Sequence, residues 1–251
     1  MNNDLIRKYG VIFKYLKKDG QATQVHFTVD VGYKGELRDG SHLFFIDRKK
    51  VFINQKAPDL IIEQLAEKAG SCLYPMDILT SPEGPFQEIV NYEEIKKRWD
   101  DKKIELEQYY VGEIAEKIIA NLDIAYSSKH KMERAMQDDL FLLLFFMPIY
   151  RRHVDRKAAY DIELAFVPFN MPIKYHISQE VEQFLTTSQK QLIHINGYSD
   201  MTVLAEPDFQ LHYKIDNETK SIFSIVGEVS LVKEKDKTQK IEIELYQLDD
   251  Q

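Results

Sequence analysis

Apolar and polar residues alternate near the N-terminus, which is the pattern of an antiparallel strand with one buried and one solvent-exposed face. The alternation is clearest over 25–33, where the apolar members are Val25, Phe27, Val29, Val31 and Tyr33. An apolar-rich stretch over 9–16 precedes it, and the polar turn Lys17-Lys18-Asp19-Gly20 between the two fits a hairpin. These residues therefore predict a first pair of strands.

Residues 43–54 continue the pattern of strands, and residues 58–85 lead from strands to helices. Residues 43–47 and 51–54 flank the polar triplet 48–50, which predicts a second hairpin and brings the total to about four strands. Three further features follow along the chain: a short helix over 58–70, a strand over 73–79 and a Pro- and Gly-rich break over 81–85. We place the change from strands to helices at that break.

The middle of the chain carries apolar residues at steps of four and seven, which fall on one face of an α-helix. Asn91 followed by Glu94 resembles a capping box and opens this pattern, which runs to Leu122. One helix of about 30 residues fits the pattern, and so do two shorter helices with a break near 100–103 or at Gly112.

A further helix is predicted from its cap at Ser128 onward, with Pro148 ending or kinking it. Its second half, 141–147, is apolar on every side, so we expect it at the centre of the core. The apolar run over 140–150 is about half of the roughly 20 residues that a bilayer span needs. The sequence therefore predicts no membrane span.

The last hundred residues return to strands, with a short helix capped by Ser178 and a tight turn at Asn196-Gly197. A polar hairpin loop over 233–237 separates the last two strands. The predicted strands cover 160–167, 173–177, 191–195, 201–205, 209–215, 222–231 and 241–248.

The order of elements, strands then helices then strands, with hairpin turns between strands, predicts an α+β fold. We expect a curved, mostly antiparallel sheet, formed by the N- and C-terminal strands and packed on the central helical segment. A single domain over 1–251 is the main prediction, and the alternative is a strand-then-helix domain over 1–150 and an antiparallel β domain over 158–251. In outline this architecture is similar to the half-barrels of lipophilic carriers of the bacterial envelope.

Charge and cysteine content narrow the class of protein. The 251 residues carry a net charge of -8, which disfavours nucleic acid and anionic lipid as partners recognised through overall charge. The single cysteine, Cys72, forms no internal disulfide, and the N-terminal residues lack the apolar core of a signal peptide. Both features favour a cytoplasmic protein.

The sequence contains none of the catalytic or metal-binding motifs that we sought. It has no glycine-rich phosphate loop, no serine elbow and no paired cysteines, and its seven histidines lack ligand spacing. We therefore predict no metal and no cofactor, and we favour a non-enzyme. Were the protein an enzyme with a dispersed site, Asp139, His153 and Cys72 would be weak catalytic candidates.

Two groups of residues are candidate sites. The basic cluster after the apolar helix comprises Arg151, Arg152, Arg156 and Lys157, and it either complements the helix dipole or docks an acidic partner or a phosphate. An aromatic set either lines an apolar pocket, together with the inward Phe27, Val29 and Val31, or forms a solid core. Its members are Trp99, Tyr110, Phe141, Phe145 and Phe146.

Three functions remain open from the sequence. The main hypothesis is a non-catalytic protein-interaction module: an adaptor, an assembly component or an inhibitor of a partner protein. A second protein is its expected partner, and a homo-oligomer is an alternative. The second hypothesis is a carrier of an apolar ligand in a cavity between sheet and helices. The third is an enzyme with a dispersed site.

Overall fold

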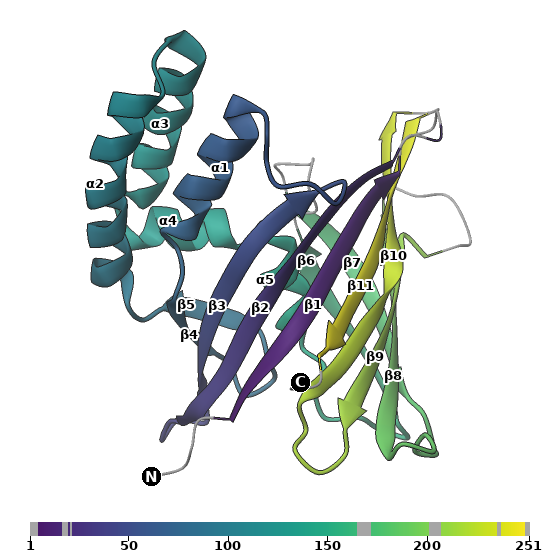
Figure 1. Cartoon of the computed structure of the whole chain (residues 1–251). Helices are drawn as coiled ribbons and strands as arrows, with labels where there is room; N and C mark the ends of the chain where they lie inside the picture. Colours follow the sequence, from purple (N-terminus) through teal and green to yellow (C-terminus); the bar gives the residue numbers. More distant parts are fainter. Residues whose placement is uncertain are drawn as a thin grey trace.

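A computed structural model describes residues 5–16, 20, 22–164, 172–200, 207–234 and 237–248 of the chain. Within these residues eleven strands form one sheet, in the order β5-β4-β3-β2-β1-β11-β10-β9-β8-β7-β6, and every neighbouring pair is antiparallel (Figure 1). Five helices complete the described part. The predicted fold class, an α+β protein with a curved antiparallel sheet packed on helices, is confirmed.

The two strand-rich ends of the chain share this sheet. The N-terminal strands are β1 (Leu5–Leu16), β2 (Ala22–Glu36), β3 (His42–Ile53), β4 (Met76–Thr80) and β5 (Phe86–Ile89). The C-terminal strands are β6 (Lys157–Leu164), β7 (Ile173–Val181), β8 (Lys190–Ser199), β9 (Phe209–Asp216), β10 (Ile222–Glu234) and β11 (Lys237–Gln247). The first strand, β1, pairs with the last, β11, and joins the two halves.

The helices occupy two places. Figure 1 shows α1 (Ile61–Ser71), α2 (Tyr92–Tyr109), α3 (Glu113–Tyr126) and α4 (Lys129–Met136) at the side of the sheet near β3 to β5. The helix α5 (Leu140–Phe145) lies inside the bend of the sheet. No helix within the described ranges is long and apolar enough to cross a membrane.

Both halves of the sheet pack on α5. The ring of Tyr9 in β1 meets the ring of Phe145 at 5.2 Å, and the Tyr213 hydroxyl in β9 donates to the Leu144 carbonyl at 2.9 Å. Phe141 meets Phe27 of β2 at 6.3 Å between centroids. These contacts place the apolar segment at the centre of the core, as its all-round apolar character predicts.

The residues before α5 do not continue a helix, so the prediction of one helix from Ser128 through the apolar run is wrong. α4 ends at Met136, and α5 starts at Leu140 with Asp139 as its N-cap. The Asp139 carboxylate accepts a hydrogen bond from the Leu142 amide at 3.0 Å. The question left open for 91–122 is also answered: Gly112, at φ 113°, separates α2 from α3.

The segment 48–50 lies within β3, so the predicted hairpin turn there is wrong. The register of β2 against β3 shifts between Phe27 and Val29, because β3 carries an extra residue in a β-bulge. The Arg48 guanidinium lies 5.6 Å from the Phe27 ring and 4.8 Å from the Tyr74 ring. A bulge interrupts the alternation of side chains, which explains why this polar triplet resembles a turn.

Two predictions in the C-terminal half are also wrong. Ser178 caps no helix but lies in β7, whose residues Tyr175, Ile177 and Gln179 are buried in alternation. The Asn196-Gly197 pair lies inside β8, where a Cβ on Gly197 would come within 2.1 Å of the Phe209 ring. The absence of a side chain at Gly197 therefore leaves space for the Phe209 ring, and the chain makes no turn there. The predicted strand over 201–205 lies outside the described residues, as do residues 17–19 of the first predicted turn and residues 235–236 of the last loop.

Candidate ligand-binding groove

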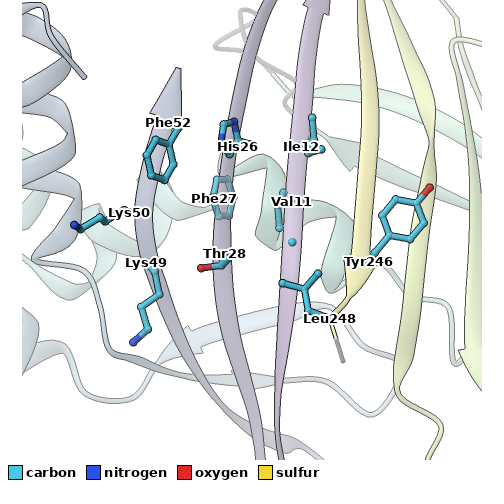
Figure 2. A pocket seen from close by; sticks show the side chains of 11 residues that line it. Val11, Ile12, His26, Phe27, Thr28, Lys49, Lys50, Phe52, Tyr246 and Leu248 are labelled. Atoms are coloured by element: carbon cyan, nitrogen blue, oxygen red, sulfur yellow. The ribbon is translucent and has the colours of Figure 1, made fainter. Parts of the chain in front are cut away.

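An apolar groove of ≈ 640 Å³ crosses the outer face of the sheet, the face that points away from α5. It spans β3, β2, β1 and the end of β11, and Figure 2 shows the side chains that line it. The residues that line it are Gly10, Val11, Ile12, His26, Phe27, Thr28, Lys49, Lys50, Phe52, Tyr246 and Leu248. Of these, Val11 and Phe27 have side chains that are buried on the inner face. We call this feature the outer groove.

The hollow exists because Gly10 has no side chain. In the strand register Gly10 faces Thr28 of β2 on one side and Tyr246 of β11 on the other. A Cβ added to Gly10 would point outward and meet the side chain of Leu248 at 3.3 Å. The absence of a side chain at Gly10, next to the small side chain of Thr28, therefore forms the floor of the groove.

One wall of the groove is a row of three side chains on neighbouring strands. Ile12 faces His26 across the β1–β2 pair, and His26 faces Phe52 across the β2–β3 pair. The His26 and Phe52 rings stack with centroids 5.0 Å apart and planes 10° apart. Tyr246 and Leu248, exposed to 42% and 38%, stand across from this row (Figure 2). The walls are therefore mostly apolar although they face solvent.

Charged side chains border the groove at both ends. At the β3 end, Lys49 forms an ion pair with Asp47 and lies 3.6 Å from a carboxylate oxygen of Asp30. At the β11 end, the Leu248 amide donates to the backbone carbonyl of Lys8, whose side chain is exposed. On β1 beyond Ile12, the Lys14 ammonium donates to Glu244 at 2.6 Å. The hydrogen bonds to carboxylates raise the pKa of Lys49 and of Lys14, so both are charged at neutral pH.

The predicted basic cluster lies elsewhere, beyond the last turn of α5. Because α5 ends at Phe145, the cluster does not sit at the helix terminus, where the helix dipole acts. Arg151 instead contacts Glu83 at 3.1 Å and lies over the Tyr160 ring, and Lys157 lies 3.6 Å from Glu180. Arg152 and Arg156 are exposed. A docking role for this cluster stays a prediction.

The five aromatic residues of the predicted apolar pocket fall into two packed groups. Trp99 stacks on Tyr126 at 4.6 Å within the helices at the side of the sheet, and the Tyr110 hydroxyl donates to Gln64 at 3.3 Å. The other group, at α5, contains Phe141, Phe145 and Phe146, whose successive rings lie 5.2 Å apart. All five side chains are at most 7% exposed. Other rings fill the space beside these side chains, and their role as a ligand pocket stays a prediction.

The three weak catalytic candidates have structural contacts. Asp139 caps α5 and lies 3.9 Å from Arg48. Burial raises the pKa of the Cys72 thiol and lowers the pKa of His153, whose Nε2 lies 2.8 Å from the Gln179 side chain. Over the described part of the chain, no group of three or more His, Cys, Asp or Glu side chains is placed to hold a metal ion.

Sequence reasoning missed the outer groove. The alternation over 25–33 implies that His26 lies on the solvent-exposed face, as it does, but the alternation indicates no apolar partner for His26 there. The signal was the run Gly10-Val11-Ile12, in which a small and an apolar residue occupy the outward positions that alternation reserves for polar ones.

No protein-family model matches the chain, and no curated protein is similar to it. Lipovitellin, solved for its lipid–protein interactions, aligns with 9% identity and a TM-score of 0.45 over 97% of this chain and 25% of its own, so this chain spans a quarter of its length. A β-barrel-like protein of a domain of unknown function from Brucella abortus aligns with 6% identity and a TM-score of 0.27, over 98% of this chain and all of its own. A domain from Vibrio parahaemolyticus assigned to outer membrane lipoprotein sorting aligns with 5% identity and a TM-score of 0.20, over 97% and 84%. The candidate site therefore rests on its own geometry.

Proposed function

We propose that the protein binds an apolar small molecule in the outer groove and acts as its carrier. The observation that carries this proposal is an apolar hollow of ≈ 640 Å³ on a face of the sheet that is otherwise open to water. Its volume lies within the range of about 300–1,000 Å³ that small-molecule sites occupy. A ligand that covers these walls removes apolar surface from water, which favours binding by about 25 cal/mol per Å².

The outer groove supports this function better than the inside of the bend does. The apolar-carrier hypothesis from the sequence placed the ligand between sheet and helices, where the rings of Phe141, Phe145 and Phe146 now pack on the sheet. A ligand entering there would have to displace buried side chains from a close-packed core. The outer groove lies on the opposite face and is open to a ligand without such a rearrangement.

Titration of the full chain with decanol, followed by isothermal titration calorimetry, tests the proposal. Wild type is expected to bind, and Gly10→Val is expected to lose at least tenfold in affinity because the valine side chain would project into the hollow. Gly32→Val is the matched control. Gly32 lies in the adjacent strand β2, its added Cβ would also meet a flexible side chain at 3.3 Å, that of Ile6, and it does not line the groove. Absence of binding, or equal binding by wild type and Gly10→Val, would contradict the proposal.

A second candidate function, the protein-interaction module, is favoured by an exposed apolar surface at one end of the helices. We call it the helical tip; its side chains are 54–82% exposed and comprise Leu60, Ile61, Ile62, Tyr109, Val111 and Ile114. The tip is where α1 begins and where α2 gives way to α3 (Figure 1). A cluster of exposed apolar side chains of this kind is typical of an interaction surface.

The charges at these helix ends are mixed: the Lys68 ammonium lies 5.0 Å from the Tyr109 ring, and Glu113 pairs with Lys117 at 2.6 Å. The exposed apolar side chains of the helical tip therefore favour a partner protein with an apolar patch of its own. The test is a co-purification in which wild type is compared with Ile61→Ser/Val111→Ser. The expected result is a defined partner that the double variant loses and that Lys50→Gln, a change outside the tip, retains. If the double variant retained the partner, the helical tip would not be the surface that binds it.

A further inference from the structure

We infer that two histidines on the outer face of the C-terminal half of the sheet bind a divalent transition-metal ion, with Cu²⁺ as the ion that fits best. They are His194 in β8 and His212 in β9, which are adjacent strands (Figure 1). This metal site lies apart from the outer groove and does not depend on the proposed function. It follows from the strand register and from a carboxylate that orients one of the two imidazole rings.

The strand register brings the two histidines together. His194 lies directly opposite His212 in the antiparallel β8–β9 pair. Residues in this relation project from the same face of the sheet, with Cβ atoms about 4.5–5.5 Å apart. Leu211 and Tyr213, on either side of His212, are buried on the inner face, so both imidazoles project outward. The two histidines are 18 residues apart in the chain, which explains why no ligand spacing is visible in the sequence.

The two rings direct one nitrogen each toward the same point. Their Nδ1 atoms lie 2.6 Å apart, and the ring planes are inclined by 77°. Two nitrogens that bind one metal ion at about 2.0–2.1 Å and at a right angle lie about 2.9 Å apart, whereas a tetrahedral angle separates them by about 3.3 Å. The rings therefore need a small outward shift for square-planar coordination and a larger one for tetrahedral coordination. This difference favours Cu²⁺ or Ni²⁺ over Zn²⁺.

Glu182, which follows β7, determines which nitrogen of His194 is free to bind. Its carboxylate lies 2.9 Å from Nε2 of His194, so Nε2 donates a hydrogen bond to it and Nδ1 keeps its lone pair. Histidines that bind metals commonly donate their second ring N–H to a carboxylate in this way. Without a metal ion, Nδ1 of His212 donates to Nδ1 of His194. When the ion binds, that proton passes through water to Nε2 of the exposed His212 ring, and both Nδ1 atoms become ligands.

The site supplies two protein ligands and leaves the other positions of the ion to water. In the part of the chain that the structure describes, no group of three His, Cys, Asp or Glu side chains is placed to complete a metal site. His212 is exposed and His194 is half-buried, so water reaches both rings. Imidazole nitrogens suit transition metals, whereas Mg²⁺ and Ca²⁺ prefer oxygen ligands. The pair is therefore expected to select by metal type.

Titration of the untagged full chain with CuCl₂, followed by calorimetry and by electron paramagnetic resonance, tests the inference. We expect one Cu²⁺ ion per chain and a spectrum with hyperfine splitting from two nitrogens. Ni²⁺ and Zn²⁺ are expected to bind more weakly than Cu²⁺, in keeping with the general order of affinities. MgCl₂ is the control salt and should give no binding heat.

Variants assign the ligands and the residue that positions them. His194→Gln and His212→Gln should each weaken Cu²⁺ binding by at least about tenfold and remove one nitrogen from the spectrum. Glu182→Ala should weaken it by roughly tenfold while the two-nitrogen spectrum remains, and Glu182→Gln, which keeps a hydrogen-bond acceptor, should restore part of the affinity. His130→Gln, at an exposed histidine in α4, is the matched control and should change neither quantity.

Two kinds of result would overturn the inference. The first is an absence of Cu²⁺ binding, or a wild-type spectrum with splitting from one nitrogen only. The second is an affinity for Cu²⁺ that is equal in wild type, His194→Gln and His212→Gln, because the ion would then bind elsewhere. Decanol binding is expected to be the same in all of these variants, so the outcome for the metal site is independent of the outcome for the outer groove.

Discussion

The two halves of the sheet have similar inner faces and different outer faces. On the inner face, strands of both halves bury apolar side chains in strict alternation, as β2 does with Phe27, Val29 and Val31 and β9 does with Leu211 and Tyr213. On the outer face, β9 is exposed and polar, whereas β1 to β3 and the end of β11 carry the outer groove. Burial in the core explains the first pattern, but it does not explain apolar walls that face solvent.

Glycines illustrate the same difference. Gly197 and Gly227 of the C-terminal half lie where a Cβ would meet other atoms at 2.1 and 2.0 Å, so close packing requires them. Gly10 in the N-terminal half has only a flexible leucine side chain, at 3.3 Å, next to the position of a Cβ. Close packing does not require this glycine, and its effect is to leave a hollow. The outer groove is therefore a feature that the packing of the sheet does not need.

The largest expected effect that tests this comparison is that of Gly227→Ala. The new Cβ would lie 2.0 Å from the backbone oxygen of Gln210 in β9, which cannot move without shifting the strand. We expect a loss of about 4 kcal/mol or more in the free energy of unfolding, measured by urea denaturation. Gly10→Ala is the control and should change it by less than about 1 kcal/mol. Similar losses in the two variants would show that Gly10 is also a packing glycine.

The next prediction compares the effect on stability of removing an aromatic side chain in the core, Phe145, and one at the outer groove, Tyr246. Phe145 is buried inside the bend against Tyr9, whereas Tyr246 is 42% exposed at the groove. Phe145→Ala is expected to destabilise the protein by about 3–4 kcal/mol, and Tyr246→Ala by less than about 1 kcal/mol. Thermal unfolding monitored by circular dichroism measures both. A large loss in Tyr246→Ala would mean that the outer groove belongs to the structural core.

A smaller effect comes from the polar outer side of the C-terminal half. Asp216 accepts hydrogen bonds from Lys190 and from the Thr219 amide, and these bonds hold the pKa of its carboxyl well below its usual range. A carboxyl with a lowered pKa in the folded state stabilises the fold above its unfolded pKa of about 3.9, and this contribution is lost as the pH falls below that value.

Asp216→Asn is therefore expected to lower the free energy of unfolding by about 1 kcal/mol at pH 7 and by progressively less below pH of about 4. Urea denaturation at a series of pH values measures the difference. A difference between wild type and variant that is constant down to the lowest pH would contradict the assigned ion pair.

The sequence predicted the features that depend on local alternation. The strands around Phe27 and Tyr213, the antiparallel sheet and the central position of the 141–147 segment all follow from residues close to one another in the chain. The predictions from local pattern were wrong where contacts between strands determine the structure instead. Residues 48–50 are held in a bulge by β2, and Gly197 is required by the ring of Phe209.

For the same reason, the sequence held one sign of the outer groove, the outward Gly10 and Ile12, but could not show the residues that complete it. Its floor at Gly10 becomes a hollow only because Tyr246 and Leu248, from the opposite end of the chain, are brought beside it by the pairing of β1 with β11.

The most direct test of the central claim, that the outer groove is a ligand site, is a titration of isotope-labelled full chain with decanol followed by amide chemical shifts. The shifted amides are expected to cluster at Gly10, Ile12, Thr28, Phe52 and Tyr246, and the amides of α5 are expected to remain unchanged. Shifts confined to α5 and the inner face would place the ligand inside the bend and contradict the claim, as would a spectrum that does not respond.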